Sequence, residues 1–518
     1  MATDVTTPPL VIIGIDAGDP GFIQRWAQEG YLPTIASIMQ RGCWGYTGGP
    51  ELLSEHGVWV SLFSGLSRSQ HGYYFYRQLQ PGTYDIANVT GSNFDAPPFW
   101  SSLSGQGKKV AVIDVPDLPV LPGLPGIQVA NWAVHDSWDP EAFPTRTAPA
   151  ELLGDIQQRF GAKLSMLETH HSSLAEDRRI YHELLRHVEK KGALCRHLLA
   201  QDSFDLSVIV FAEAHAANHQ FWPYCQEAHG HAVRGDDELT QAVRHIYQAI
   251  DREIDLVLAQ LPTEANVCIV SSVGMEDEYP AIGLIEDFCR QLGYQTPASG
   301  TASRPIDIVR RLVPQSWRAA VSRHLCSRAQ RERLLADQFR RGTDWHKTTA
   351  FALPTTYTSF IRVNLRGREP QGTVALGAEY EALLDRLVDD LKQLVDPQTD
   401  QPAVVRVAKT IEVFGCNPHP FLPDLFIEWQ PGHFMSSVVH PRATLTQEKP
   451  EFYRPSDHCS QGFVAAAGPA IQPRGLLGEV NVLDLAPTFL ELLHQPIPSQ
   501  LTGKTIEAML DRSTRRGN

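Results

Sequence analysis

The sequence predicts an α/β fold with a doubly wound, mostly parallel sheet that is flanked by helices. Three short apolar runs predict buried strands, at Leu10 to Ile15, Leu206 to Phe211 and Val267 to Val270, and segments with helical spacing separate them. Alternation of strands and helices is typical of parallel sheets, and all-apolar strands are typical of sheets covered on both faces. We therefore expect the three strands to end at one edge of the sheet, where open α/β sheets bind ligands.

The remaining elements of this sheet follow in order along the chain. A polar loop leads into a short buried helix at Val58 to Phe63, and a further strand is expected within Lys109 to Val115. Apolar residues recur at helical spacing in residues 150–199 and 236–261, which predicts long amphipathic helices. Further strands are expected at 356–363, 423–429 and 463–467, and further helices at 20–29, 379–394 and in the C-terminal DLAPTFLELL.

Residues 276–346 are basic and helical in pattern, which indicates an insertion at the rim of the sheet. We expect residues 8–290 and 400–510 to form the α/β core, and residues 291–399 to form a helical and mixed insertion or cap.

Composition limits the classes of partner. A net charge of −14 over 518 residues disfavours binding to nucleic acid or to an anionic membrane. The apolar run at Leu10 to Ile15 is too short for a signal sequence or a membrane span, and the eight cysteines form no CxxC pair. We expect a cytoplasmic protein that acts on a small molecule, without a nucleic-acid or membrane partner; its oligomeric state is not predicted.

Two histidines follow the second of the apolar strands. His215 and His219 lie four residues apart in FAEAHAANHQFWP, so a helix would place both imidazoles on one face, one turn apart. That spacing suits a metal ion, and it also suits a structural pair. Asp16 follows the first strand, either as a ligand or as the N-cap of the next helix.

Several segments together resemble the alkaline phosphatase superfamily, in its type I phosphodiesterase/nucleotide pyrophosphatase branch. The segments are GIDAGDPGFIQRWAQEGYLPTIASIMQRG, WVSLFSGLSRSQHG, DWHKTTAFALP, IRVNLRGREPQGTV, PDLFIEW, HCSQGFVAAAGPAI and VNVLDLAPTFLELLHQPIPSQLTGKTI, in the order of the family. More narrowly, they look like its predicted phosphohydrolase/phosphomutase-like members. The resemblance covers nearly the whole chain and implies an alkaline-phosphatase-like fold.

The resemblance also implies a site with two metal ions and a Thr or Ser nucleophile. Asp16 matches the aspartate of the first strand, and His458 matches a late histidine ligand. The Asp-x-x-x-His motif of the family falls on His215 and His219, so histidine replaces its aspartate. The nucleophile position falls on Glu55, with Ser54 one residue away.

The second metal position departs further from the family. Its Asp-His pair falls on Ser272 and Val273, which are a poor ligand and no ligand. The expected site is therefore mononuclear, with His215, His219 and His458, a carboxylate from Glu55, and Asp16 as a less certain ligand. Such a set suits a divalent transition metal such as Zn, Fe or Mn, and the sequence does not choose among them.

Three functions fit this site. The first is a hydrolase of phosphoric, sulfuric or related esters, with Glu55 as metal ligand or general base, or with Ser54 as a shifted nucleophile. The second is a mononuclear Fe or Mn oxygenase, lyase or decarboxylase, and the third is a non-catalytic binding protein. Tyr73, Arg77 and His56 are candidate substrate-binding residues. Core packing is the commoner use of a run such as the one that holds Tyr73, surface exposure is the commoner state of an arginine, and His56 could instead contact a ligand residue.

Overall fold

The computed structural model describes residues 7–54, 56–133, 143–164, 173–229, 236–277, 283–298, 328–355, 358–415, 417–449 and 454–512. The chain forms two compact units. The first comprises Met1–His71, Thr90–Asp277 and Pro455–Asn518, and the second comprises Gly72–Val89 and Glu278–Arg454. Within the described residues, no helix is long and apolar enough to cross a membrane.

The first unit is built on a nine-stranded sheet in the order β21-β2-β20-β9-β1-β8-β5-β6-β7. Its central strands run parallel, and β20 pairs antiparallel with both of its neighbours. Every residue of β1 and β8 is buried, as all-apolar strands between two helical layers require. The strands are β1 (Leu10–Ile15), β2 (Cys43–Gly48), β5 (Val110–Ile113), β6 (Gly126–Ala130), β7 (Arg146–Ala148), β8 (Leu206–Phe211), β9 (Asn266–Ser271), β20 (Gly462–Ala467) and β21 (Gly475–Asn481).

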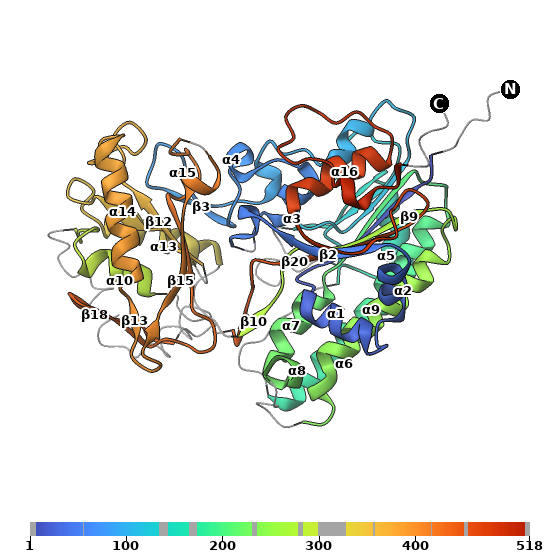
Figure 1. The fold of residues 1–518 in the computed structure, drawn as a ribbon, viewed down its shortest axis with the longest axis horizontal. Helices are drawn as coiled ribbons and strands as arrows, with labels where there is room; N and C mark the ends of the chain where they lie inside the picture. The colour runs from blue at the N-terminus through green and yellow to red at the C-terminus, as the bar shows by residue number, and fades with distance from the viewer. Residues whose placement is uncertain are drawn as a thin grey trace. The chain divides into compact units, whose positions relative to one another are not determined.

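Helices cover both faces of this sheet. In Figure 1, α3 and α16 lie on one side of the strands, and α1, α2, α6, α7 and α9 lie on the other. The doubly wound, mostly parallel arrangement that the sequence predicts is confirmed. The helices of this unit are α1 (Pro20–Gln28), α2 (Pro33–Arg41), α3 (Val58–Ser64), α4 (Arg68–His71), α5 (Leu152–Phe160), α6 (Leu174–Leu199), α7 (Glu213–Phe221), α8 (Gln226–His229), α9 (Ala242–Leu258) and α16 (Leu485–Leu492).

The second unit has its own hydrophobic core between antiparallel sheets and helices. One sheet has the order β11-β12-β16-β15 and another has the order β14-β13-β17-β18. The strands are β3 (Arg77–Leu79), β4 (Ile86–Asn88), β11 (Ala350–Ala352), β12 (Ser359–Val363), β13 (Val395–Asp396), β14 (Gln401–Pro402), β15 (Val404–Lys409), β16 (Leu425–Trp429), β17 (Ser437–His440) and β18 (Ala443–Thr446). The helices are α10 (Leu284–Gln291), α13 (Arg328–Arg341), α14 (Ala378–Lys392) and α15 (Thr410–Val413).

The boundaries of the second unit differ from the expected insertion at 291–399. The unit continues to residue 454 because β16 pairs with β12, and β15 pairs with β16, rather than with the large sheet. It also takes in residues 72–89, which form the β3–β4 hairpin.

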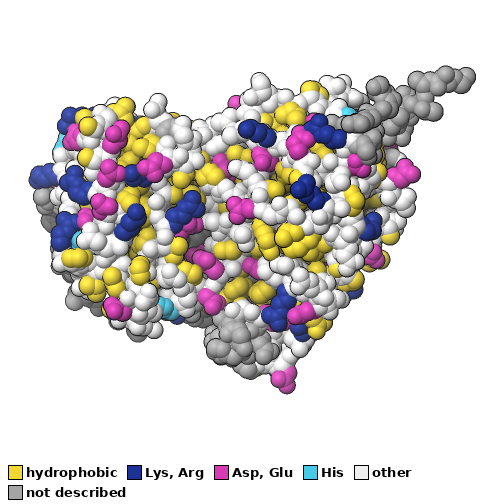
Figure 2. Space-filling model, viewed as in Figure 1, with side chains coloured by type: hydrophobic (Ala, Val, Ile, Leu, Met, Phe, Trp, Pro, Cys, Tyr) yellow, Lys and Arg dark blue, Asp and Glu magenta, His cyan; other side chains and the backbone are white. Residues whose placement is uncertain are grey.

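Charged side chains of both signs are interspersed on the molecular face drawn in Figure 2. No broad field of one sign covers the described residues visible there, in keeping with the modest negative net charge of the chain.

Candidate metal centre

The three strands of the sequence prediction end side by side. Ile15 of β1 lies opposite Phe211 of β8 and Ser271 of β9, and all three strands run parallel. The residues that follow them therefore meet at one edge of the sheet, as expected. This edge carries Asp16, the start of α7 and Ser272.

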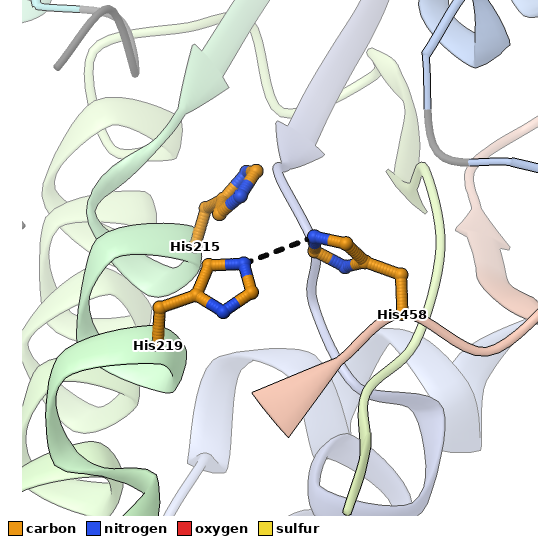
Figure 3. A group of neighbouring side chains, drawn as sticks. All are labelled: His215, His219 and His458. Carbon is orange, nitrogen blue, oxygen red and sulfur yellow. Dashed lines mark hydrogen bonds between the residues drawn. The ribbon is translucent and has the colours of Figure 1, made fainter. Parts of the chain in front are cut away.

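Helix α7 presents the first two histidines. It begins at Glu213, two residues after the end of β8. Ala214, Ala217 and Phe221 form a fully buried stripe on this helix, and the small alanines allow close packing. His215 and His219, one turn apart, project from another side of the helix (Figure 3).

His458 reaches the same place from the C-terminal part of the chain. It follows β19 (Ser456–Asp457), which pairs antiparallel with β10 (Glu276–Asp277). Because β10 comes five residues after the end of β9, this short ladder holds His458 beside the ends of the central strands.

The three imidazoles converge, as Figure 3 shows. Their candidate ligand atoms all lie within 4.8 Å of one another, and the Nε2 atoms of His219 and His458 are 3.0 Å apart. Two imidazole nitrogens bound tetrahedrally to one ion at about 2.0–2.1 Å would lie about 3.3 Å apart. The spacing and the donor chemistry therefore fit one transition-metal ion, and this is the only such group of potential ligands among the residues that the structure describes.

Hydrogen bonds fix the orientation of two of these rings. His219 Nδ1 lies 2.9 Å from Ser456 Oγ, and His215 Nδ1 lies 2.9 Å from Asp16 Oδ2. A contact at Nδ1 sets the tautomer and turns Nε2 toward the metal position, as in many histidine-metal sites.

Asp16 contacts three side chains at the end of β1. Its Oδ1 accepts hydrogen bonds from Trp59 Nε1 at 2.7 Å and from Ser272 Oγ at 3.0 Å, while Oδ2 contacts His215. Asp16 is absent from the group of converging ligand atoms. Its Oδ2 is placed to orient the ring of His215, and its expected place among the ligands stays a prediction.

The position of the second metal ion in the resembling family is filled by other contacts. Ser272 Oγ donates to Asp16 and accepts from the backbone N–H of Ala17 at 3.0 Å, and Val273 is buried with 2% exposure. A hydroxyl engaged in this way and an apolar side chain provide no second set of ligands. The number of metal ions stays a prediction.

A buried polar frame supports the loop after β1. Asn218 Nδ2 donates to the carbonyl of Ala17 at 2.7 Å, and Asp19 accepts from the N–H groups of Phe22 and Met275. Burial raises the pKa of Asp19, and these N–H groups act in the opposite direction. Asp19, rather than Asp16, thus caps α1.

Burial also prepares His458 for a cation. Desolvation lowers the pKa of His458 to about 4, and the Asp16 carboxylate opposes this effect. The imidazole is therefore neutral at neutral pH, which is the form that binds a metal.

The segment that carries the expected nucleophile is described in part. Glu55 lies outside the described residues. Ser54 has a left-handed backbone with φ of 68°, and its carbonyl accepts a hydrogen bond from buried Arg68, as does the carbonyl of His56. These contacts involve the backbone, so the side-chain roles of Ser54 and His56 stay predictions.

Tyr73 and Arg77 belong to the second unit. Tyr73 is buried with 1% exposure, and Arg77 forms two hydrogen bonds with Glu332, at 2.8 and 2.9 Å. This ion pair occupies two of the guanidinium nitrogens of Arg77, a candidate substrate-binding residue. Substrate contact by either residue stays a prediction.

Sequence reasoning missed Trp59 and Ser456 as supporting residues of the site. Each acts through a contact with a residue far away along the chain, at Asp16 and His219 respectively. Trp59 lies in an apolar run that resembles ordinary core, so its indole N–H carried no distinguishing signal.

The family model for type I phosphodiesterase / nucleotide pyrophosphatase matches residues 10–442. Among solved structures, the chain is similar to murine ectonucleotide pyrophosphatase/phosphodiesterase 5, in an inactive form in complex with AMP, with 10% identity and a TM-score of 0.49; the match covers 97% of this chain and 100% of that one. The human protein of the same name matches with 11% identity, a TM-score of 0.48 and the same coverage. No curated protein matches the chain.

Proposed function

Because the chain belongs to the type I phosphodiesterase / nucleotide pyrophosphatase family, we propose that it is a metal-dependent hydrolase of phosphoric or related esters that works with one metal ion. The observation that carries the proposal is the convergence of His215, His219 and His458 at the edge of the sheet where the central strands end. The proposed ion is a divalent transition metal, with Zn, Fe and Mn as candidates.

In this proposal, different residues bind the metal ion, orient its ligands and take part in the hydrolysis. The three imidazoles hold the ion, and Asp16 and Ser456 fix two of the rings. When bound, the ion would polarise the ester oxygen and lower the pKa of a water molecule. Glu55 would add a carboxylate ligand or accept a proton from the attacking water, and Ser54 is the alternative nucleophile.

A hydrolysis assay with chromogenic esters tests this function. The protein would be loaded with Zn²⁺ or Mn²⁺ and given bis(p-nitrophenyl) phosphate, p-nitrophenyl phosphate or p-nitrophenyl sulfate without oxygen. We expect release of p-nitrophenolate from at least one ester, and loss of more than about 100-fold in rate in His219→Ala, because a three-ligand site becomes a two-ligand site.

His245→Ala is the matched control, since this histidine contacts Tyr181 on α6 and no member of the cluster. Its rate should equal that of the wild type. A metal-loaded protein that hydrolyses none of the three esters would overturn the proposal. Oxygen consumption by an iron-loaded sample in the absence of hydrolysis would replace it with the oxygenase alternative.

A further inference from the structure

We propose that Arg68 is a positioning residue that fixes the main chain at Leu53, Ser54 and His56, where Ser54 is the alternative nucleophile of the proposed function. This inference rests on the proposed function for its catalytic meaning and on the structure for its contacts. Arg68 is the first residue of α4 and is fully buried, with 0% exposure.

The guanidinium group of Arg68 donates hydrogen bonds to three main-chain carbonyls. Nη1 donates to the carbonyl of Leu53, and Nη2 donates to those of Ser54 and His56, at 2.9 and 2.6 Å for the latter two. A planar guanidinium has five donors in a rigid fork, which a lysine ammonium does not reproduce. One side chain thus orients the carbonyl groups of Leu53, Ser54 and His56.

This segment has a conformation that needs external support. Ser54 has φ of 68° and the adjoining Gly57 has φ of 80°. A left-handed conformation at a residue with a side chain is strained and persists only where the surroundings impose it. Each fixed carbonyl also fixes the opposite N–H of the same peptide group, because the peptide is planar and trans.

Glu51 lies near enough to interact with this charge. Its side chain is fully buried on the turn Pro50–Leu52, and burial raises its pKa while the Arg68 charge acts to lower it. A buried guanidinium is costly without compensating contacts, and the three carbonyls provide such contacts.

The variants Arg68→Ala and Arg68→Lys test the proposal, with Arg196→Ala as the matched control. Arg196 pairs with Glu253 on α9, so its removal also deletes a partly buried arginine contact but leaves the loop untouched. Three quantities would be measured: metal content, hydrogen exchange of peptides that span residues 49–60, and kcat and KM for the ester hydrolysed by the wild type.

We expect Arg68→Ala to retain the metal, because the three histidines are unchanged. Exchange in residues 49–60 should become at least about tenfold faster, while other regions change no more than in Arg196→Ala. The value of kcat should fall roughly 100-fold with little change in KM, as expected for a misplaced reacting group. Added guanidinium ion should restore part of kcat in Arg68→Ala, and Arg68→Lys should lie between the two.

Unchanged exchange in residues 49–60 would overturn the proposal whatever the reaction is. A fall in kcat that Arg196→Ala reproduces, or one that guanidinium does not relieve, would also overturn it and leave only a structural role. If the wild type hydrolyses no ester, the proposed function fails separately, and hydrogen exchange still decides whether Arg68 fixes the loop.

Discussion

At the scale of single residues, the main finding is that Asp16 contacts Trp59, His215 and Ser272. The sequence could place His215, His219 and His458 in one site, because they fall on ligand positions of the family that the chain resembles. The structure brings the three side chains together. It could not reveal what Asp16 contacts, because Trp59 and Ser272 reach it from distant parts of the chain. Its three contacts leave it best suited to hold the ring of His215 in place.

This role predicts the effect of Asp16→Asn. An amide oxygen accepts a weaker hydrogen bond from His215 Nδ1 than a carboxylate does, so the ring should be held less firmly. We therefore expect the metal affinity to fall about 10- to 100-fold. Competition with a chromogenic chelator measures that affinity.

Asp251→Asn is the control for a buried carboxylate elsewhere, since Asp251 accepts from the N–H groups of Thr34 and Ile35. It should leave the affinity unchanged. Equal affinities in the wild type and Asp16→Asn would show that Asp16 does not act through His215.

At the scale of elements, the strands that position the site were the most predictable. The runs Leu10–Ile15 and Leu206–Phe211 are strands with the expected bounds, because a fully apolar run between turn residues leaves few alternatives. Strands β2 and β21 were missed, since each contains two glycines and β21 is only partly buried. Helix bounds differed by a few residues where short 3₁₀ turns precede the helix, as before α9.

The turn that carries Glu51 gives a prediction of pH dependence. Burial raises the pKa of Glu51 above its value in the unfolded chain, about 4.3, so the folded state favours the protonated carboxyl. Its stabilising contribution is present below that pH and is lost as the pH rises through the folded pKa. We expect Glu51→Gln to gain stability relative to the wild type as the pH rises above about 4.3.

Urea unfolding midpoints at several pH values would measure this difference. Glu381→Gln, on an exposed position of α14, should show no such trend. A constant difference between the wild type and Glu51→Gln, or one of the opposite sign, would contradict the assigned direction of the pKa.

At the scale of the whole molecule, the family and the α/β core were predictable, because ordered motifs along the chain carry both. The extent of the second unit was not. Its β15 and β16 look like any other strands in the sequence, and only the antiparallel pairing of β16 with β12 and of β15 with β16 assigns them to it. The resemblance placed Ser272 and Val273 at the second metal position of the family, but it did not reveal that Ser272 contacts Asp16 and the backbone of Ala17.

The central claim is that one metal ion is held by three histidines. Elemental analysis of the purified protein after metal loading and removal of excess ion tests it most directly, with His458→Ala beside the wild type. We expect close to one equivalent in the wild type and almost none in His458→Ala. Two equivalents in the wild type, none, or an unchanged content in His458→Ala would contradict the one-metal site.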